Sequence, residues 1–433
     1  MVLVMPENPF EIESVKALLA LDSRGRPTVK AIIETRGGGR GVAIAPSGAS
    51  TGSKEAVELR DGGRAWKGRG VGLAISRIET VIAPALIGLD SRSQALVDST
   101  LVALDGTRNK SFLGGNSTTA VSIANAKAAS ATAGLPLYEY LGGPAARVLP
   151  TPLLNVINGG VHAGNPLDIQ EFLLIPVGAN GFTEAIRIAV EVYDDLKSII
   201  AERYGKQATA VGDEGGFAPP VARAGEALSL MVEAIEKAGY TAGRDFLLGI
   251  DAAASQFYRE GKYRLSGEGL ELDRNGLLEY YTRLVEDYPI AYIEDPFDES
   301  DWEGFKEITR SLGSRVLIVG DDIYCTNPSI LERGIREGAS NAALLKVNQV
   351  GTLTEALDYA RMASQAGLRV VVSHRSGDTE DPFIADLAVA LGHGLIKTGA
   401  PARSERNAKY NRLIEIEHEL GPVARYAGRA PFP

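Results

Sequence analysis

The sequence predicts an α/β fold in which a β/α barrel of the TIM type follows a smaller α+β domain. Beyond the first third of the chain, short apolar runs alternate with helix-length amphipathic segments over about 280 residues, a pattern typical of parallel strands joined by helical crossovers. The first third differs, because strand-like runs come first and helical segments follow. A chain of 433 residues is also too long for one ordinary domain.

The first part of the chain combines three short strands with a helical region. Strand-like runs cover residues 14–21, 28–35 and 41–46, and the glycine-rich turn at 37–39 suits a hairpin. From about residue 55 to 142 the pattern is helical, and its alanine-rich stretch at 120–133 should pack closely against a neighbouring element. Residues 141–152 hold two glycines and three prolines. We therefore expect an N-terminal domain over residues 1–143 and a barrel over 144–433.

Six apolar runs in the second part are predicted strands, and each is closely followed by an ionisable residue. The runs cover 246–250, 290–293, 316–319, 342–345, 369–373 and 394–396. The residues that follow them are, in order, Asp251, Glu294, Asp321, Lys346, His374 and Lys397. In a parallel barrel all strands open their carboxyl ends on one face, so these side chains should converge. A single charge at a strand end can simply be tolerated by solvent, but six in succession favour a functional site.

Three of these residues, Asp251, Glu294 and Asp321, are carboxylates from successive strands. Like charges in one mouth repel each other and lose hydration unless a cation lies between them. Oxygen ligands select a hard cation, and Mg²⁺ is the one that fits best. A zinc site has little support, because the chain has only four histidines and one cysteine. The alternative is that these acids cap helices or pair with arginines.

Positive charge is expected at the same rim from Lys346, Arg375 and Lys397. Arg375 together with Ser376 can grip a phosphate through a forked guanidinium and a hydroxyl. A partly desolvated lysine near other cations can lose its proton and serve as a base. Lysines beside metal-bound carboxylates can equally be structural counter-ions.

Three glycine-flanked loops present further polar groups. Residues 158–165 carry His162, residues 211–217 carry Glu214, and residues 47–52 carry Ser50. Glycine lets a backbone approach a ligand closely and lets a loop move. The third loop precedes the first long helix and is either a helix-capping region or a mobile lid. Taken alone, either of the first two loops is better explained as a surface turn, and the third is ambiguous.

Bulk composition limits the partners. The 45 basic and 55 acidic residues leave a formal charge of −10, which repels nucleic acid and anionic membranes. Cys325 is the single cysteine, so an intramolecular disulfide is impossible and a reducing compartment is expected. We find no signal-peptide pattern and no apolar run approaching the roughly 18 residues of a membrane span. We therefore expect a cytoplasmic protein with no nucleic-acid or membrane partner.

Taken together, these segments resemble the enolase family over nearly the whole chain, from about residue 22 to 421. Eight stretches carry the resemblance: 46–52 (PSGASTG), 158–162 (NGGVH), 170–172 (QEF), 211–216 (VGDEGG), 293–297 (IEDPF), 345–349 (LKVNQ), 373–377 (SHRSG) and 396–406 (IKTGAPARSER). One of them would mean little, whereas eight in the right order are specific.

The resemblance implies a lyase that interconverts 2-phosphoglycerate and phosphoenolpyruvate, a reaction of glycolysis and gluconeogenesis. It also implies an α+β N-terminal domain followed by an eight-stranded β/α barrel of the enolase type, whose first strands depart from simple β/α alternation. Two Mg²⁺ ions are implied for each active site. Asp251, Glu294 and Asp321 match the ligands of the first, and Ser50 matches a ligand of the second, which arrives with substrate.

The resemblance further implies Lys346 as general base and Glu214 as general acid. The positions implied to bind or surround the substrate are Gln170, Arg375, Ser376, Lys397, His162, Glu171 and His374. We also expect a homo-oligomer, a dimer or larger. One departure is Lys54, which stands in the presumed lid where many relatives carry an aromatic or imidazole ring.

Two other functions compete with this interpretation. A racemase or cycloisomerase of the same superfamily typically has a Lys-x-Lys pair on an early barrel strand, which we do not find, and would have no use for the Arg375–Ser376 phosphate grip. A non-catalytic role, as a lens-type structural protein or a scaffold in an RNA-degrading complex, would be favoured by loss of Lys346 or Glu214. Both residues are present.

Overall fold

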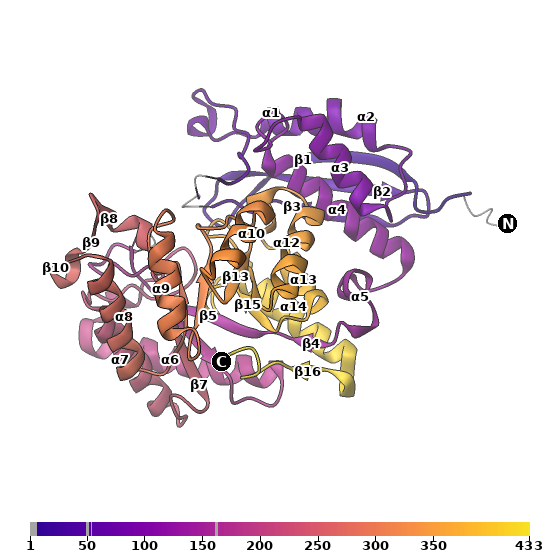
Figure 1. The fold of residues 1–433 in the computed structure, drawn as a ribbon. Helices are drawn as coiled ribbons and strands as arrows, with labels where there is room; N and C mark the ends of the chain where they lie inside the picture. Colours follow the sequence, from indigo (N-terminus) through magenta and orange to yellow (C-terminus); the bar gives the residue numbers. More distant parts are fainter. Residues whose placement is uncertain (1–6, 49–51, 53, 161–162) are drawn as a thin grey trace.

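The chain begins with a three-stranded antiparallel sheet covered by helices. The computed structural model describes residues 7–48, 52, 54–160 and 163–433. The sheet has the order β1 (Ile12–Leu21), β2 (Pro27–Thr35), β3 (Arg40–Ile44). The helices that follow are α1 (Gly72–Arg77), α2 (Ala83–Leu86), α3 (Gln94–Asp105), α4 (Gly115–Ala133) and α5 (Leu137–Gly142). Figure 1 shows this unit, in indigo and violet, on one side of the barrel.

The alanine-rich helix α4 packs on the sheet at very short range. Gly41 in β3 makes this possible, because a Cβ at that position would lie 1.9 Å from the backbone oxygen of Ala124. A residue with a side chain would push the helix off the sheet. The expected close packing of the alanine-rich stretch is therefore observed, and it depends on glycine in the facing strand.

The second part of the chain is a closed eight-stranded barrel, which confirms the predicted fold class. Its strand order is β5-β6-β7-β11-β12-β13-β14-β15. The strands are β5 (Thr151–Asn158), β6 (Glu171–Pro176), β7 (Phe246–Asp251), β11 (Ile290–Glu294), β12 (Leu317–Gly320), β13 (Ala342–Leu345), β14 (Arg369–Ser373) and β15 (Leu395–Lys397).

Strand β6 runs against its two neighbours, whereas the other pairs of the barrel are parallel. The implied departure from simple alternation is therefore present. Because β6 is reversed, its first residue lies at the rim where the other strands end. Glu171 accordingly pairs with Asn158 on one side and Asp251 on the other.

Helices surround the barrel: α6 (Phe182–Tyr204), α7 (Ala224–Lys237), α8 (Arg274–Asp287), α9 (Trp302–Leu312), α10 (Pro328–Glu337), α11 (Val347–Val350), α12 (Leu353–Gln365), α13 (Phe383–Leu391) and α14 (Ser404–Leu420). Several begin at a side chain that caps the first turn. Asp273 accepts from the Gly276 amide at 2.9 Å and Asp301 from the Gly304 amide at 3.1 Å. Two small sheets complete the fold, one of β8 (Tyr258–Arg259), β9 (Lys262–Leu265) and β10 (Leu270–Leu272), the other of β4 (Val148–Leu149) and β16 (Arg425–Tyr426).

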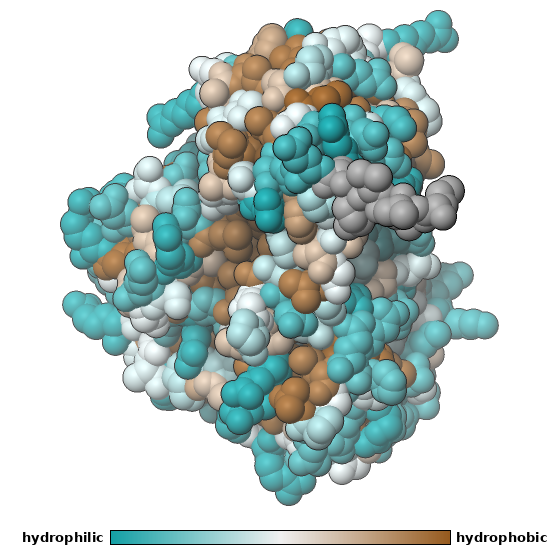
Figure 2. Space-filling model, turned by 90° about the vertical axis from the view of Figure 1, so that its right-hand side faces the viewer, coloured by the Kyte–Doolittle hydropathy of each residue, from teal (hydrophilic) through white to brown (hydrophobic). Residues whose placement is uncertain are grey.

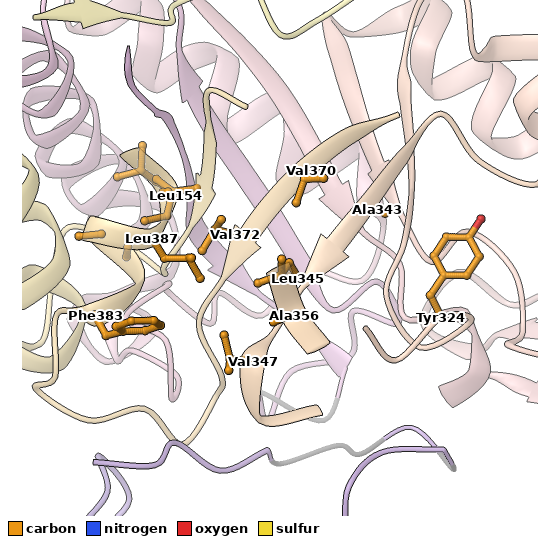
Figure 3. Close-up of a cluster of buried hydrophobic side chains, with 14 of the residues drawn as sticks. Leu154, Tyr324, Ala343, Leu345, Val347, Ala356, Val370, Val372, Phe383 and Leu387 are labelled. Carbon is orange, nitrogen blue, oxygen red and sulfur yellow. The ribbon is translucent and has the colours of Figure 1, made fainter. Parts of the chain in front are cut away.

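The hydrophobic core has two layers because strand side chains alternate between faces. In β13, Ala342 and Leu344 point into the barrel interior, while Ala343 and Leu345 belong to the larger core outside it. Figure 3 shows part of that outer core, where Val372 of β14 lies near Leu387 and Phe383 of α13. These packed layers hold the strand ends, and hence the residues that follow them, in fixed positions.

The outer surface is chemically mixed. Figure 2 shows one face, on which hydrophobic residues are interspersed with hydrophilic ones. The edge strand β1 exposes Leu18, Leu19 and Leu21 to 52%, 42% and 53%. Among the helices that the structure describes, none is both long and apolar enough to cross a membrane.

Candidate active site

The six ionisable residues predicted at strand ends lie on one rim of the barrel. Asp251, Glu294 and Lys397 are the last residues of β7, β11 and β15, while Asp321, Lys346 and His374 directly follow β12, β13 and β14. A single recess is lined by five of them, the exception being Glu294, and also by Gln170, Glu171, Glu214, Arg375 and Ser376. Ser50 and His162 fall outside the described residues.

Lys397 is the centre of a buried group of carboxylates. Its Nζ lies 2.8 Å from Asp251 Oδ2, 2.8 Å from Glu294 Oε2 and 3.2 Å from Glu171 Oε2. All four side chains are at most 7% exposed. Burial opposes the charge on Lys397, but the three carboxylates outweigh it and raise the pKa of the amine well above its usual value. One protonated lysine thus faces three acids.

Lys346 forms an ion pair with Asp321 Oδ2. The second oxygen of Asp321 accepts a hydrogen bond from Gln349 Nε2 at 2.9 Å. Burial lowers the pKa of the Lys346 amine, yet Asp321 and Glu294 outweigh that effect and the net shift is upward. In this arrangement the ion pair with Asp321 favours the protonated form of Lys346.

The carboxylates of this rim fit a hard divalent cation. Glu294 Oε1 is buried and has no hydrogen-bond partner among the residues that the structure describes. Burial, reinforced by Asp251, raises the pKa of Glu294 to about 8. A buried carboxylate oxygen without a donor, beside further acids, is stabilised by a metal ion with oxygen ligands. Asp251, Glu294 and Asp321 are thus chemically suitable as the set that would hold Mg²⁺.

A second acidic group lies beside this set. One carboxylate oxygen from each of Asp295, Asp321 and Asp322 lies within 4.8 Å of the others. Asp295, however, already accepts hydrogen bonds from the backbone amides of Asp321 at 2.9 Å and Asp322 at 2.8 Å. Asp295 therefore shapes the turn after β12 and so positions Asp321.

The guanidinium of Arg375 holds a carboxylate in a two-pronged contact. Its NH1 lies 2.9 Å from Glu55 Oε2 and its NH2 3.1 Å from Glu55 Oε1. Asn348 Oδ1 accepts from NH1 at 3.0 Å. Glu55 also accepts from the Gly52 amide at 2.9 Å, so Gly52 is linked through Glu55 to Arg375 of the barrel. An anion-binding fork of the kind predicted for phosphate is present, and a carboxylate of the protein occupies it.

Glu214 lies against His374 in the same recess. His374 Nε2 is 3.4 Å from Glu214 Oε2, and Asn155 Nδ2 donates to the same oxygen at 3.0 Å. Burial is the main cause that lowers the pKa of His374 to about 4, and Arg406 adds to it, so the ring is neutral at pH 7. Burial and the neighbouring Glu214 raise the pKa of Glu171 well above its usual value. The Glu171–Glu214 pair is therefore suited to retain a proton.

Gln170, at the rim just before β6, is oriented by a neighbour. Gln256 Nε2 donates to Gln170 Oε1 at 2.7 Å, and Gln170 Nε2 lies 3.5 Å from Asp251 Oδ2.

Ser47, which precedes the undescribed residues 49–51, is bound to the segment that follows β14. Ser47 and Gly377 exchange two backbone hydrogen bonds of 2.8 and 2.9 Å.

Sequence reasoning did not single out Glu55, Asn155, Gln256 and Arg406, each of which contacts a predicted site residue. Two of them had a usable signal. Glu55 lies three residues beyond the loop motif that ends at Gly52, and Arg406 is the last residue of the stretch 396–406. Asn155 and Gln256 gave no signal, because a single amide in a strand or turn is common.

A closed β/α barrel whose strands end in converging acids and lysines defines this chain as a barrel enzyme. Residues 12–141 match the family model described as the enolase N-terminal domain, and residues 146–432 match the enolase C-terminal TIM barrel domain. The chain is 59% identical to an enolase of Aeropyrum pernix, over 98% of both chains, and 58% identical to one of Pyrococcus furiosus, again over 98% of both. It is 57% identical to an enolase of Thermococcus gammatolerans, covering 98% of this chain and 100% of that one. The chain belongs to the enolase family and is a carbon–oxygen lyase.

Proposed function

We propose that this lyase interconverts 2-phosphoglycerate and phosphoenolpyruvate in the cytoplasm, with two Mg²⁺ ions in each active site. The observation that carries the proposal is the meeting of Asp251, Glu294 and Glu171 around Lys397 at one rim, with the anion-binding fork of Arg375 beside them. A metal-binding acid set next to a phosphate-binding arginine suits a substrate that carries both a carboxylate and a phosphate.

The chemistry requires positive charge at this place. The proton to be removed lies next to a carboxylate, so the intermediate carries two negative charges on one group. When bound, the Mg²⁺ ions offset this developing charge. Lys397 supplies a further fixed positive charge whose position is set by three carboxylates, which means that little reorganisation is needed as the intermediate forms.

We assign the removal of the proton to Lys346 and the departure of hydroxide to Glu214. A lysine base beside one or two Mg²⁺ ions is the general arrangement of enolase-superfamily sites, so the first assignment follows from the family. Hydroxide is a poor leaving group and needs an acid that is still protonated near pH 7. The raised pKa of Glu171, caused by burial and by Glu214, supports a proton held between these two residues.

The remaining predicted residues have binding roles in this proposal. Arg375 and Ser376 hold the phosphate, which must displace Glu55 from the guanidinium. Gln170, Glu171, His374 and Lys397 surround the rest of the substrate. Ser50 and His162, outside the described residues, keep their proposed roles in the second metal site and in lining the pocket.

We also propose a division into domains at residues 143/144 and a homo-oligomeric assembly. The two family matches end at residue 141 and resume at 146, which supports the boundary. The exposed Leu18, Leu19 and Leu21 on the edge strand β1 support self-association, because a second chain would cover them.

The experiment is an absorbance assay for phosphoenolpyruvate after 2-phosphoglycerate is added. We expect turnover with Mg²⁺, loss of turnover after treatment with EDTA, and recovery when Mg²⁺ is restored in excess. Lys346→Ala serves as the inactive reference. Full activity of a metal-free preparation would refute the metal requirement. Absence of activity with Mg²⁺ present would refute 2-phosphoglycerate as the substrate.

A further inference from the structure

Arg406 is a fully buried arginine that no step of the proposed mechanism uses. It lies in the first turn of α14, and its side chain is 0% exposed. Arg406 is not among the described residues that line the recess. A buried guanidinium is costly unless its donors are satisfied, so the groups that it binds indicate why it is there.

The terminal nitrogens of Arg406 make four short contacts. NH1 lies 2.6 Å from His374 Nδ1 and donates to the Arg375 carbonyl at 2.7 Å. NH2 donates to the Ser376 carbonyl at 2.7 Å and to the Asp213 carbonyl at 3.1 Å. Each nitrogen has two hydrogens, so these contacts use all four donors. The partners belong to the segment that follows β14 and to the loop that carries Glu214.

The contact of Arg406 with Nδ1 of His374 determines the tautomer of the His374 ring. A guanidinium only donates hydrogen bonds, so Nδ1 of His374 must accept. The proton of the neutral ring is then on Nε2, which lies 3.4 Å from Glu214 Oε2. The lowered pKa of His374 agrees with a neutral ring, because protonation would set an N–H of the ring against the guanidinium.

The charged groups around Arg406 leave this arrangement intact. Asp378 Oδ2 lies 3.8 Å from NH1 and Glu405 Oε1 lies 3.4 Å from Nε, so two carboxylates balance the charge of the guanidinium. Lys409 binds Asp378 at 3.0 Å and keeps that carboxylate ionised, since it lowers the pKa of Asp378 against the effect of burial. The ring nitrogen is therefore bound by a permanently charged donor.

We propose that Arg406 is a positioning residue for the lyase reaction: it fixes the Nε2–H tautomer of His374, which donates to Glu214, and holds the backbone of two segments that contribute residues to the recess. The proposal rests on the proposed function where it concerns Glu214 as the acid. Its effect on Glu214 is indirect. With the other tautomer, a ring lone pair would face the carboxylate and repel it.

The test is ¹⁵N NMR of protein labelled at histidine, because the two ring nitrogens of a neutral tautomer have different shifts. The chain has only four histidines, so a His374→Asn variant assigns the signal. We expect wild-type His374 to be protonated at Nε2 at pH 7. Arg406→Lys has its donors on a single atom and cannot reach the ring and all three carbonyls. We expect it to populate both tautomers and to lose at least about tenfold in kcat, as is typical when an orienting partner is removed.

Arg403→Lys is the matched control. Arg403 precedes the same helix and donates to the carbonyls of Ser23 at 3.0 Å and Gly212 at 3.3 Å, but no contact with His374 is recorded within the described part of the chain. We expect this variant to keep the His374 tautomer and to retain kcat within about threefold.

The measurements separate this proposal from the proposed function. A wild-type His374 protonated at Nδ1 overturns the proposal, whether or not 2-phosphoglycerate is turned over, and needs no variant to fold. An Arg406→Lys protein with unchanged tautomer and kcat also overturns it. An Nε2–H ring that becomes mixed in Arg406→Lys supports the positioning role, even if the substrate proves to be another carboxylate.

Discussion

Replacing Arg375 with lysine tests the phosphate site while the positive charge is kept. In the structure, NH1 and NH2 of Arg375 hold the two oxygens of Glu55 at 2.9 and 3.1 Å, and a phosphate would use the same two donors. Lysine offers a single point of attachment, so one charge-assisted hydrogen bond is lost. Such a bond contributes about 1.5–3 kcal/mol, which corresponds to roughly 10- to 150-fold in kcat/KM.

Because Arg375 already binds Glu55, we expect the loss of kcat/KM in Arg375→Lys to lie at the lower end of this range. The same fork binds Glu55 in the free protein, so the substitution weakens the free and the substrate-bound states together and part of the effect cancels. We therefore expect kcat/KM for 2-phosphoglycerate to fall by at least about tenfold, or about 1.4 kcal/mol.

The assay is the initial rate of phosphoenolpyruvate formation over a range of substrate concentrations at saturating Mg²⁺. Arg361→Lys is a suitable control, because the side chain of Arg361 is 70% exposed and pairs only with Asp358 among the described residues. It should leave kcat/KM unchanged. An unchanged value for Arg375→Lys would mean that another group holds the phosphate.

Three further predictions concern the metal, Lys54 and the two proton transfers. Asp321→Asn should weaken Mg²⁺ binding at least about tenfold in calorimetric titration, because an anionic ligand becomes neutral; unaltered binding would exclude Asp321 as a ligand. Lys54→Ala should keep most activity, and a loss as large as that of Lys346→Ala would reveal a catalytic group that relatives lack. In D₂O, proton NMR of 2-phosphoglycerate should show α-proton exchange with Glu214→Gln but none with Lys346→Ala, since only the latter lacks the base. If Glu214→Gln blocks exchange equally, the roles are misassigned or the steps are inseparable.

Much of the barrel could be predicted because most of its parallel strands are short runs with apolar residues at consecutive positions. The predicted strands at 342–345 and 369–373 coincide with β13 and β14. Strands β5 and β6 were not recognised from local pattern. Buried polar residues such as Asn155, Asn158 and Glu171 interrupt their apolar character. These side chains are tolerated inside the protein because partners from distant segments surround them, and such partners are not visible in a local pattern.

The sequence by itself determined which ionisable residues reach the rim. A parallel strand that ends in Asp, Glu, Lys or His must place that residue at the mouth, so six members of the site followed from strand ends alone. The family resemblance then assigned chemical roles to them and added the loop residues.

Only the tertiary structure decided how these residues are paired. Glu55 and Arg375 are 320 positions apart, and the N-terminal domain and the barrel must meet before their two-pronged contact exists. Arg406 reaches His374 because α14 packs against the segment after β14. Which buried charge meets which depends on long-range packing, since a hydrogen bond requires atoms within about 3 Å and sequence spacing says nothing about distances of that size between remote segments.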